Sequence, residues 1–434
     1  MRMAICLAAL AASAHASGAV SSVALSDVAF SQPAGRGDAL ITYSLGEAPA
    51  IITVDVQTNS LDNGEGEWTS LGGGIVKSLS GDFGIVRKTG ACSIRWACAK
   101  DWPGRVVATG RIRAVVSAWA TNAPPDWMVV GLGKQNDVRF YAESNHVPEG
   151  VESDLYKGAE LLMRRIPAAG RVWTMGITPE EYDDETMVPT NNMPHRVMLT
   201  RDYFMGVYEV TQGQYTNIGM SAASGFTGYE DSWKRPVSHI NNGAMRGALA
   251  SLDGKYNAGP SSACGLIYAK TGVEFDLPTE AQWEYACRAG TTSAFNNGGG
   301  CTDDDYDEVG WNGNNSKTGT TDNKMQPHAV GLLSPNSYGL YDMHGNVQEV
   351  CLDRWTSGTD WLDTFAPGFE DGSVTIDPRG GSTWSTANRI VVRGGSYTSG
   401  HGRDLGRSGN RGEMTYTYHG DYNGFRLCCP AVFR

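Results

Sequence analysis

The chain lacks several features that would point to common partners. After its first residues no apolar run is long enough to span a bilayer, so we expect no membrane span. There is no cluster of basic residues, and 35 Lys and Arg against 47 Asp and Glu give a formal net charge of −12. A nucleic-acid partner is therefore not expected. The sequence has no paired C-x-x-C motif and no histidine cluster at zinc spacing, which argues against a structural zinc site.

The first residues have the pattern of a secretory signal. Arg2 precedes the apolar run Met3–Ala12, and an Ala-His-Ala cleavage site ends at Ala16. The run is too short to cross a bilayer. We expect residues 1–16 to be removed and the mature protein to be secreted or periplasmic, with a buried N-terminal helix as the alternative.

Nine cysteines are present, and Cys6 lies in the expected signal, which leaves an even number. An even number of cysteines in an exported chain permits disulfides, but the sequence does not fix their pairing. Cys92 and Cys98 are spaced to close a local loop. The adjacent Cys428 and Cys429 are expected to face different environments.

The length of 434 residues predicts two domains. For residues 20–145 we expect an all-β sandwich of immunoglobulin-like form, serving as a spacer or adhesion module. Its strand-like runs are β-branched and aromatic, and turn residues separate them. The clearest are Ala50–Thr58, Arg105–Trp119, Trp127–Leu132 and Val138–Glu143.

The second domain, expected over residues 156–434, mixes short helices with irregular chain. Two T-x-x-Q capping boxes predict one helix that begins at Gln212 and another that Thr279 caps. In the second helix Glu284 and Arg288 are spaced as an i,i+4 pair, and Gly290 is expected to end it. A third helix is expected after Asn242 as cap, with an apolar face of Met245, Ala248, Leu249 and Leu252.

Two further features are interpreted as structural. Cys287, on the apolar side of the helix that Thr279 caps, is expected to be an inert core thiol rather than a nucleophile. The acidic run Asp303–Glu308 is expected to be a solvated loop, with calcium binding as the alternative.

The segment "PNSYGLYDMHGNVQEVCLDRW" is a candidate metal site. Asp342 and Glu349 bracket a Gly345-Asn346 turn, which can aim two carboxylates and the intervening backbone carbonyls at one point. Hard oxygen ligands of this kind suit calcium. The segment does not match the EF-hand loop, and a tight turn without metal is the alternative.

The segment "RGGSYTSGHGRDLGRSGNR" near the C-terminus concentrates polar groups. A serine hydrolase would use Ser396 or Ser399 with His401 and Asp404, but the chain has no G-x-S-x-G elbow. Four arginines could stabilise the domain through internal ion pairs, or they could bind a carboxylate, sulfate or phosphate group of a ligand. They are Arg393, Arg403, Arg407 and Arg411.

Seven segments in order resemble the sulfatase-modifying-factor family, whose founding members are the formylglycine-generating enzymes. They are "RIPAAGRVWTMG", "PHRVMLTRDYFMGVYEVTQGQY", "RPVSHINNGA", "FDLPTEAQWEYACRAGT", "YGLYDMHGNVQEVCLDRW", "VVRGGSY" and "NGFRLCC". The resemblance covers roughly residues 156–434. It implies an α/β domain of the family's type, with little regular secondary structure and a C-type-lectin-like outline.

The resemblance also implies metal ligands. The family's calcium loop falls on Asp342, Gly345, Val347 and Glu349. The two tryptophans that usually flank the glutamate are Gln348 and Val350 in this chain, so the neighbouring surface has changed.

The oxidase chemistry of the family is where this chain departs from the pattern. The copper-binding cysteines of formylglycine-generating enzymes follow R-G-G-S, at positions that Ser399 and Asp404 occupy here. Copper(I) requires soft sulfur ligands, so copper is not expected. The serine of R-G-G-S is retained as Ser396.

Two classes of function follow. The first is an exported, calcium-stabilised binding or accessory module without oxidase chemistry. The second is an enzyme of the family with altered chemistry, acting on a peptide or a small anionic ligand, or a formylglycine-generating oxidase acting on a sulfatase cysteine. The candidate cleft residues are Ser396, Ser399, Arg403, Asp404 and Arg407.

Overall fold

The computed structural model describes residues 23–32, 36–61, 65–105, 107, 110–178, 181, 192–221, 224–247, 256–317, 324–356, 372–380, 388–398 and 406–433. The expected signal, residues 1–16, lies outside these residues. Within the described ranges no helix is long and apolar enough to cross a membrane.

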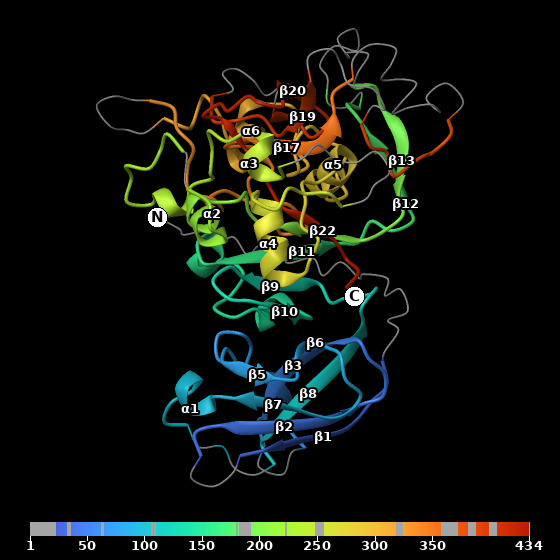
Figure 1. Ribbon diagram of the computed structural model, residues 1–434, viewed down its shortest axis with the longest axis vertical. Coiled ribbons are helices and arrows are strands. Elements are labelled where there is room, and N and C mark those ends of the chain that lie inside the picture. Colours follow the sequence, from blue (N-terminus) through green and yellow to red (C-terminus); the bar gives the residue numbers. More distant parts are fainter. Residues whose placement is uncertain are drawn as a thin grey trace, which may run out of the picture.

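The N-terminal unit consists of two antiparallel sheets, at the bottom of Figure 1. Its elements are β1 (Leu25–Ser31), β2 (Ala39–Leu45), β3 (Ala50–Asn59), β4 (Trp68–Ser70), β5 (Leu79–Gly81), β6 (Gly84–Val86), β7 (Gly90–Trp96), α1 (Cys98–Asp101) and β8 (Ile112–Ala120). One sheet has the order β1-β2-β7-β5. The other has the order β4-β3-β6, and β8 pairs with β3.

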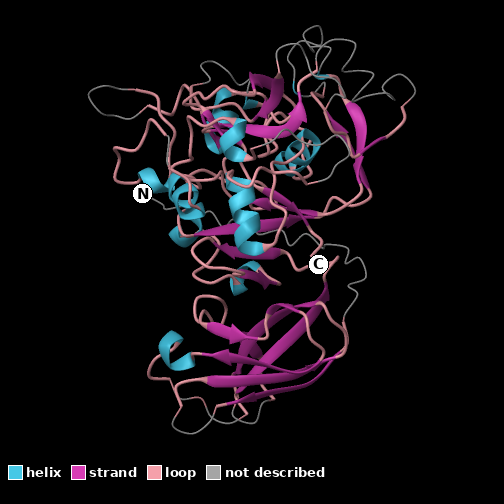
Figure 2. Cartoon of the chain, in the orientation of Figure 1, coloured by secondary structure: helices cyan, strands magenta, loops and turns pink. Residues whose placement is uncertain are grey.

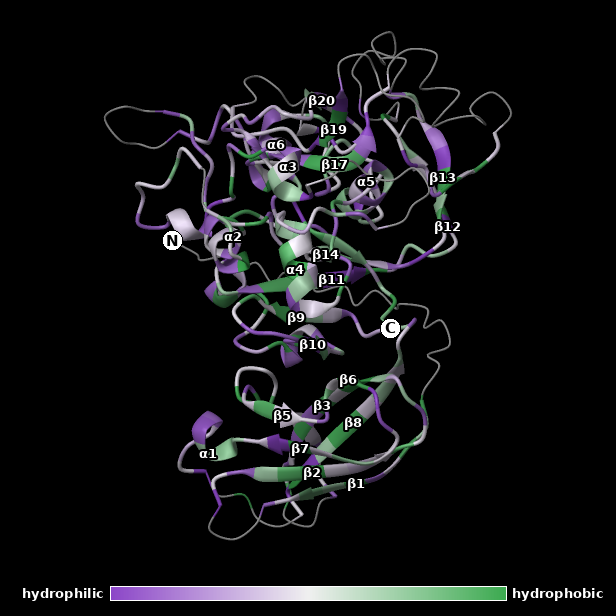
Figure 3. Ribbon diagram, viewed as in Figure 1, coloured by the Kyte–Doolittle hydropathy of each residue, from purple (hydrophilic) through white to green (hydrophobic). Residues whose placement is uncertain are grey.

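Side chains from both sheets form one hydrophobic core. Along β2 burial alternates, so that one face of the strand points inward, as expected when the other face meets water. Ile41 and Trp96 of one sheet share the core with Ile52 and Val116 of the other. Figure 3 shows the hydrophobic residues of this unit concentrated on its strands. The N-terminal unit is therefore built of β-sheet, as predicted.

The second unit is built on a five-stranded antiparallel sheet with the order β10-β9-β11-β14-β22. Its strands are β9 (Trp127–Gly131), β10 (Val138–Tyr141), β11 (Glu160–Ile166), β14 (Tyr203–Gly206) and β22 (Cys428–Pro430). The sequence placed β9 and β10 in the N-terminal sandwich, and this placement was wrong. All five residues of β9 are buried because the strand lies inside the sheet, between β10 and β11.

The rest of the second unit consists of short elements joined by long loops, as Figure 2 shows. Three smaller sheets have the orders β12-β13-β18, β15-β16 and β20-β19-β17-β21. Their strands are β12 (Arg171–Met175), β13 (His195–Leu199), β15 (Gly310–Trp311), β16 (His344–Gly345), β17 (Gln348–Arg354), β18 (Thr375–Ile376), β19 (Arg389–Arg393), β20 (Gly412–Thr415) and β21 (Asn423–Gly424). The helices are α2 (Gln212–Ile218), α3 (Asn242–Met245), α4 (Ala263–Thr271), α5 (Glu280–Arg288) and α6 (Asp303–Val309).

Both predicted capping boxes are formed. In α5, the Thr279 side chain accepts from the backbone N–H of Gln282, and the Gln282 side chain accepts from the backbone N–H of Thr279. The same reciprocal pair begins α2. The predicted Glu284–Arg288 pair is present at 2.9 Å. The left-handed residue that caps α5 is Ala289, one position before the predicted Gly290.

Two local predictions were wrong. The cap of α3 is Asn241 rather than Asn242, since its side chain accepts from the backbone N–H of Ala244. The rest of the third predicted helix, residues 248–255, lies outside the described residues. The acidic run forms helix α6 rather than a loop, because Thr302 and Asp305 make a capping box that favours acidic residues in the first turn.

Backbone hydrogen bonds fix the junction between the two units. The N–H of Phe433 donates to the carbonyl of Thr121 at 2.9 Å, and the N–H of Gly73 donates to that of Asn145 at 2.7 Å. Ile51 of β3 belongs to the same hydrophobic core as Phe140 of β10. The two units therefore pack through shared apolar contacts as well as these hydrogen bonds.

All eight cysteines from Cys92 to Cys429 are free thiols, and no disulfide joins them. Cys92 and Cys98, which the sequence suggested as a local pair, are both buried thiols. Cys428 and Cys429 pack into two different hydrophobic cores, which confirms the expectation that they face different environments.

Candidate functional site

Ser396 lies in the segment that follows β19, inside the second unit. Its exposed fraction is 2%, and its Oγ lies 2.9 Å from Oγ1 of Thr398. Residues 399–405, which come next in the sequence, lie outside the described residues. The predictions for Ser399, Arg403 and Asp404, and the triad with His401, fall within them.

Two glycines explain how the R-G-G-S segment packs. Gly394 and Gly395 have φ of 89° and 71°, which favour glycine. A Cβ on Gly395 would lie 3.0 Å from the Cα of Gly406. The carbonyl of Gly394 accepts from the N–H of Gly345 at 2.7 Å. The segment is therefore tied directly to the predicted calcium loop.

The flanking arginines are buried in ion pairs with α5. Arg393 pairs with Glu284 and with Glu280, and Arg411 donates from Nε and Nη2 to the two Glu280 oxygens at 2.5 and 2.7 Å. Burial opposes the charged form of Glu284, but Arg288 and Arg393 hold its pKa below the ordinary value. Arg393 and Arg411 therefore stabilise the domain by internal ion pairs, which is the first of the two alternatives that the sequence left open.

Arg407 is the one arginine of the candidate cleft that the structure describes. Its exposed fraction is 7%, and it lies beside the fully buried Ser408. The guanidinium is therefore not presented to solvent as a surface anion site would require.

A polar group that the sequence did not reveal lies beneath the R-G-G-S segment. Ser316 donates to the carbonyl of Tyr397 at 2.7 Å, and the ring of His328 lies 3.1 Å from the carbonyl of Ser316. The same ring stacks on Trp311 at 3.8 Å. Gln326 is 2% exposed, and neither atom of its amide has a partner among the described residues. Trp311, Ser316, Gln326 and His328 lie within residues 311–328, but their spacing matches no known motif, so the sequence did not mark them.

A second unpredicted group is exposed nearby. Nδ1 of His239 lies 3.0 Å from Oδ1 of Asp421, and its ring stacks on that of His419 with 4.9 Å between centroids. His239 has a φ of 56°, which is rare for a residue with a side chain. The carboxylate orients the imidazole, so that its Nε2 is presented away from Asp421.

The predicted calcium loop is a buried turn. Asp342 is 3% exposed, and its Oδ2 accepts from the N–H of Gly331 at 2.7 Å, while Oδ1 has no hydrogen-bond partner in the described part of the chain. Burial raises the pKa of Asp342 to about 6. The N–H of Val347 donates to Glu209, and Glu349 accepts from Trp283 and Arg426.

The charges of this region are not balanced. Three buried carboxyl groups, of Asp342, Glu349 and Glu209, lie near the single guanidinium of Arg426. Burial raises the pKa of Glu209, and the neighbouring Asp342 and Glu349 raise it further. An additional cation would favour the ionised forms of these acids.

The residues fit calcium in part. Oδ1 of Asp342 is a buried oxygen without a partner, as a metal ligand would be before binding. Both oxygens of Glu349 already accept N–H groups. No group of three or more His, Cys, Asp or Glu side chains in the described ranges has the geometry of a metal site. A calcium ion here would therefore require the backbone carbonyls of Gly345 and Val347 as well.

Copper does not fit the donor set. The two thiolate positions of the family are occupied by a hydroxyl and a carboxylate, Ser399 and Asp404. The buried thiol of Cys287 lies 3.7 Å from Nε2 of His344, and burial raises its pKa to about 12. Such a thiol is a core group, as the sequence predicted, and not a ligand at neutral pH.

Comparisons with known proteins find relatives of this chain. Residues 168–430 match the family described as "sulfatase-modifying factor enzyme 1-like domain". Chaperone protein LppX of Paenibacillus barcinonensis is 31% identical over 182 residues, 36% of this chain and 63% of that protein. A formylglycine-generating enzyme of Thermomonospora curvata is 38% identical over 124 residues, 28% of this chain and 38% of that enzyme.

Among solved structures, Treponema denticola variable protein 1 is 25% identical, with a TM-score of 0.47 over 62% of this chain and 95% of that one. The chain spans less than two thirds of the length of LppX and of the Thermomonospora enzyme. The family match covers more than half of the chain. The chain therefore belongs to the sulfatase-modifying factor enzyme 1-like family.

Proposed function

We propose that this chain is an exported binding or accessory member of its family, stabilised by calcium, that does not oxidise cysteine with copper. The observation that carries the proposal is the identity of Ser399 and Asp404 at the two copper-thiolate positions. Oxygen donors do not replace thiolates for copper(I). All eight described thiols are free, and seven of them are buried.

The relative named chaperone protein LppX supports an accessory role, because its name describes a chaperone. The signal pattern that ends at Ala16 supports export. We further propose that the N-terminal unit is an immunoglobulin-like sandwich that serves as a spacer, and that the second unit has a C-type-lectin-like outline. The ligand of the second unit would be a protein, a peptide or a small anion.

The calcium part of the proposal rests on three observations. Asp342 has an unpartnered buried oxygen, Glu349 and Glu209 add negative charge nearby, and one guanidinium, that of Arg426, faces all three. When bound, the ion would supply charge that keeps these carboxylates ionised inside the fold. The role of the ion is structural, because it would stabilise the loop whose Gly345 donates a hydrogen bond to Gly394 of the R-G-G-S segment.

A second candidate function is an enzyme of altered chemistry. It is favoured by His239, which Asp421 orients and which is exposed to solvent. An imidazole held by a carboxylate in this way can act as a general base through its other nitrogen. Replacing His239 by Gln would abolish any turnover by this route while leaving the fold intact, since the ring is surface-exposed.

The experiment that tests the proposal is an oxidase assay. The chain is incubated with a C-x-P-x-R peptide, copper and oxygen, and formylglycine is measured by mass spectrometry beside an active formylglycine-generating enzyme. We expect no conversion. A double variant, Ser399→Cys with Asp404→Cys, is expected to gain stoichiometric copper, because it restores two thiols at the family's positions. Robust turnover by the unmodified chain would overturn the proposal.

A further inference from the structure

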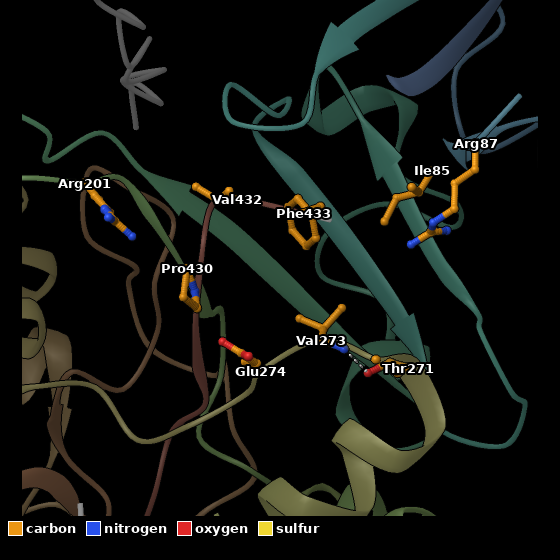
Figure 4. A pocket seen from close by; sticks show the side chains of 10 residues that line it. Ile85, Arg87, Arg201, Thr271, Val273, Glu274, Pro430, Val432 and Phe433 are labelled. Carbon is orange, nitrogen blue, oxygen red and sulfur yellow. Dashed lines mark hydrogen bonds between the residues drawn. The ribbon is translucent and has the colours of Figure 1, made fainter. Parts of the chain in front are cut away.

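A pocket of about 180 Å³ lies at the seam between the two units (Figure 4). We call it the seam pocket. Ile85 and Arg87 of the N-terminal unit form one wall, and Arg201, the end of α4 with the residues after it, and the end of the chain form the other. The lining residues of this second wall are Arg201, Thr271, Gly272, Val273, Glu274, Pro430, Val432 and Phe433.

The pocket is preformed, because its two walls are bonded to each other. The backbone bond from Phe433 to Thr121 closes one side of the junction. A Cβ on Gly84 would lie 3.0 Å from the carbonyl of Val138, which shows how closely β6 approaches β10. Preformed pockets at the boundary between two units are frequent ligand sites, and they avoid the entropic cost of ordering.

Two opposite charges lie on the same wall of the pocket. Figure 4 shows Arg201 and Glu274 on either side of Pro430. Both side chains are exposed, and neither makes a hydrogen bond or ion pair with another described residue. Arg87 adds a second guanidinium on the opposite wall. A ligand that carries both a carboxylate and an ammonium would satisfy both free charges.

Most of the other side chains that line the pocket are apolar. Ile85, Val273, Val432 and Phe433 face its interior, and Val432 is 41% exposed. The hydroxyl of Thr271 is already bonded to Ile267 and to the N–H of Val273, so it offers little to a ligand. The volume corresponds to about six water molecules, which is the size of a small metabolite rather than a folded segment.

We propose that the seam pocket binds a free α-amino acid with an apolar side chain, of the size of valine or leucine. Its carboxylate pairs with Arg201, its ammonium pairs with Glu274, and its side chain lies against Val273 and Val432. This site is separate from the R-G-G-S segment, and its occupancy does not depend on the proposed function of that segment.

The test is isothermal titration of the full chain with three related compounds. L-Leucine carries both charges, N-acetyl-L-leucine lacks the ammonium, and L-leucinamide lacks the carboxylate. We expect binding of leucine and a loss of about tenfold or more in affinity for each of the other two, because each leaves one charged group unpaired. No binding of leucine at millimolar concentration, or equal binding of all three, would overturn the proposal.

Variants locate the site. Arg201→Gln and Glu274→Gln are each expected to weaken leucine binding about tenfold or more, and Val432→Ser to weaken it less. The melting temperatures of the charge variants should equal that of the parent, since neither group has a hydrogen-bond or ion-pair partner among the described residues. The matched control is Arg379→Gln, because Arg379 lines the adjoining cavity of about 420 Å³ and not the seam pocket. Equal weakening by the control would place the ligand in that cavity and contradict the assignment.

Discussion

Arg426 and Glu349 form a pair that is wholly buried in the second unit. Nη2 of Arg426 lies 2.7 Å from Oε1 of Glu349, and Nε lies 3.0 and 3.1 Å from its two oxygens. The same guanidinium donates to the backbone carbonyls of Gly206, Val207 and Tyr341. One side chain thus joins β17 to the end of β14 and to the loop that carries Asp342.

Glu349→Gln should destabilise the protein by about 3–5 kcal/mol, because it leaves a buried guanidinium without its counter-charge. The free energy of unfolding is measured by urea denaturation. Glu149→Gln is the control, since it removes a half-exposed partner of Lys77 and should change stability little. A similar effect of both variants would contradict the importance of burial for this pair.

Calcium removal is expected to lower the melting temperature of the parent protein. Chelation would leave Asp342, Glu349 and Glu209 close to one another, with Arg426 and Lys157 as the nearby positive charges. Asp342→Asn should lower the melting temperature by itself and make it insensitive to chelator. Differential scanning calorimetry with and without chelator makes the comparison. If the parent is insensitive to chelator, the assignment of calcium to this loop is wrong.

Asp353 should make stability depend on pH. Its two oxygens accept from the N–H groups of Glu280 and Gly380, and burial, with the nearby Glu280, raises its pKa from 3.8 to about 7. The folded protein then binds a proton that the unfolded chain has lost. This contribution to stability is complete below about pH 4 and is lost as the pH rises to about 7.

Asp353→Asn should therefore flatten the fall in unfolding free energy between pH 4 and pH 7, by up to about 4 kcal/mol. The difference between parent and variant isolates this group from other titrations. Denaturant unfolding at several pH values provides the measurement. Parallel curves for the two proteins would show that Asp353 is not the group that titrates.

Native thiol labelling should be confined to one cysteine of the described set. Cys301 is partly exposed, whereas the other seven thiols are buried, and burial raises the pKa of Cys287 to about 12. The reaction with a disulfide reagent should therefore show one fast phase, which Cys301→Ser removes. The measurement uses protein without residues 1–16, so that Cys6 is absent. Fast labelling of several thiols would contradict the burial of this set.

Gly395→Ala should destabilise the R-G-G-S segment by about 1–3 kcal/mol, because the φ of 71° is unfavourable for alanine and Gly406 lies in contact. Gly74→Ala is the control, because a Cβ there meets nothing within 4 Å. Thermal unfolding compares the two variants. Equal melting temperatures would show that the segment tolerates a side chain at position 395.

The most accurate predictions from the sequence concern features that residues close together in the chain determine. The boxes at Thr211 and Thr279 need only four consecutive residues, and both helices begin where expected. The same kind of signal, Thr302 with Asp305, was present in the acidic run, but its charge suggested a solvated loop. The capping residues were sufficient to predict this helix, but the prediction gave more weight to the negative charge of the run.

What the sequence did not predict depends on partners far along the chain. Arg393 pairs with Glu284, which is 109 residues away, and Val347 with Glu209, which is 138 residues away. The position of β9 in the second sheet depends on pairing with β11, and a strand pattern alone does not specify its neighbour. Such choices are fixed by the packing of the whole unit.

The position of β9 has a consequence for truncated forms of the protein. A fragment that covers only the family match, residues 168–430, would lose β9, β10 and β11 together. One that begins at residue 156 would keep β11 but leave its edge unpaired, with Leu161 and Met163 on the strand. Exposed edges of this kind recruit other chains, so such fragments are expected to aggregate. The smallest soluble fragment should begin before Trp127.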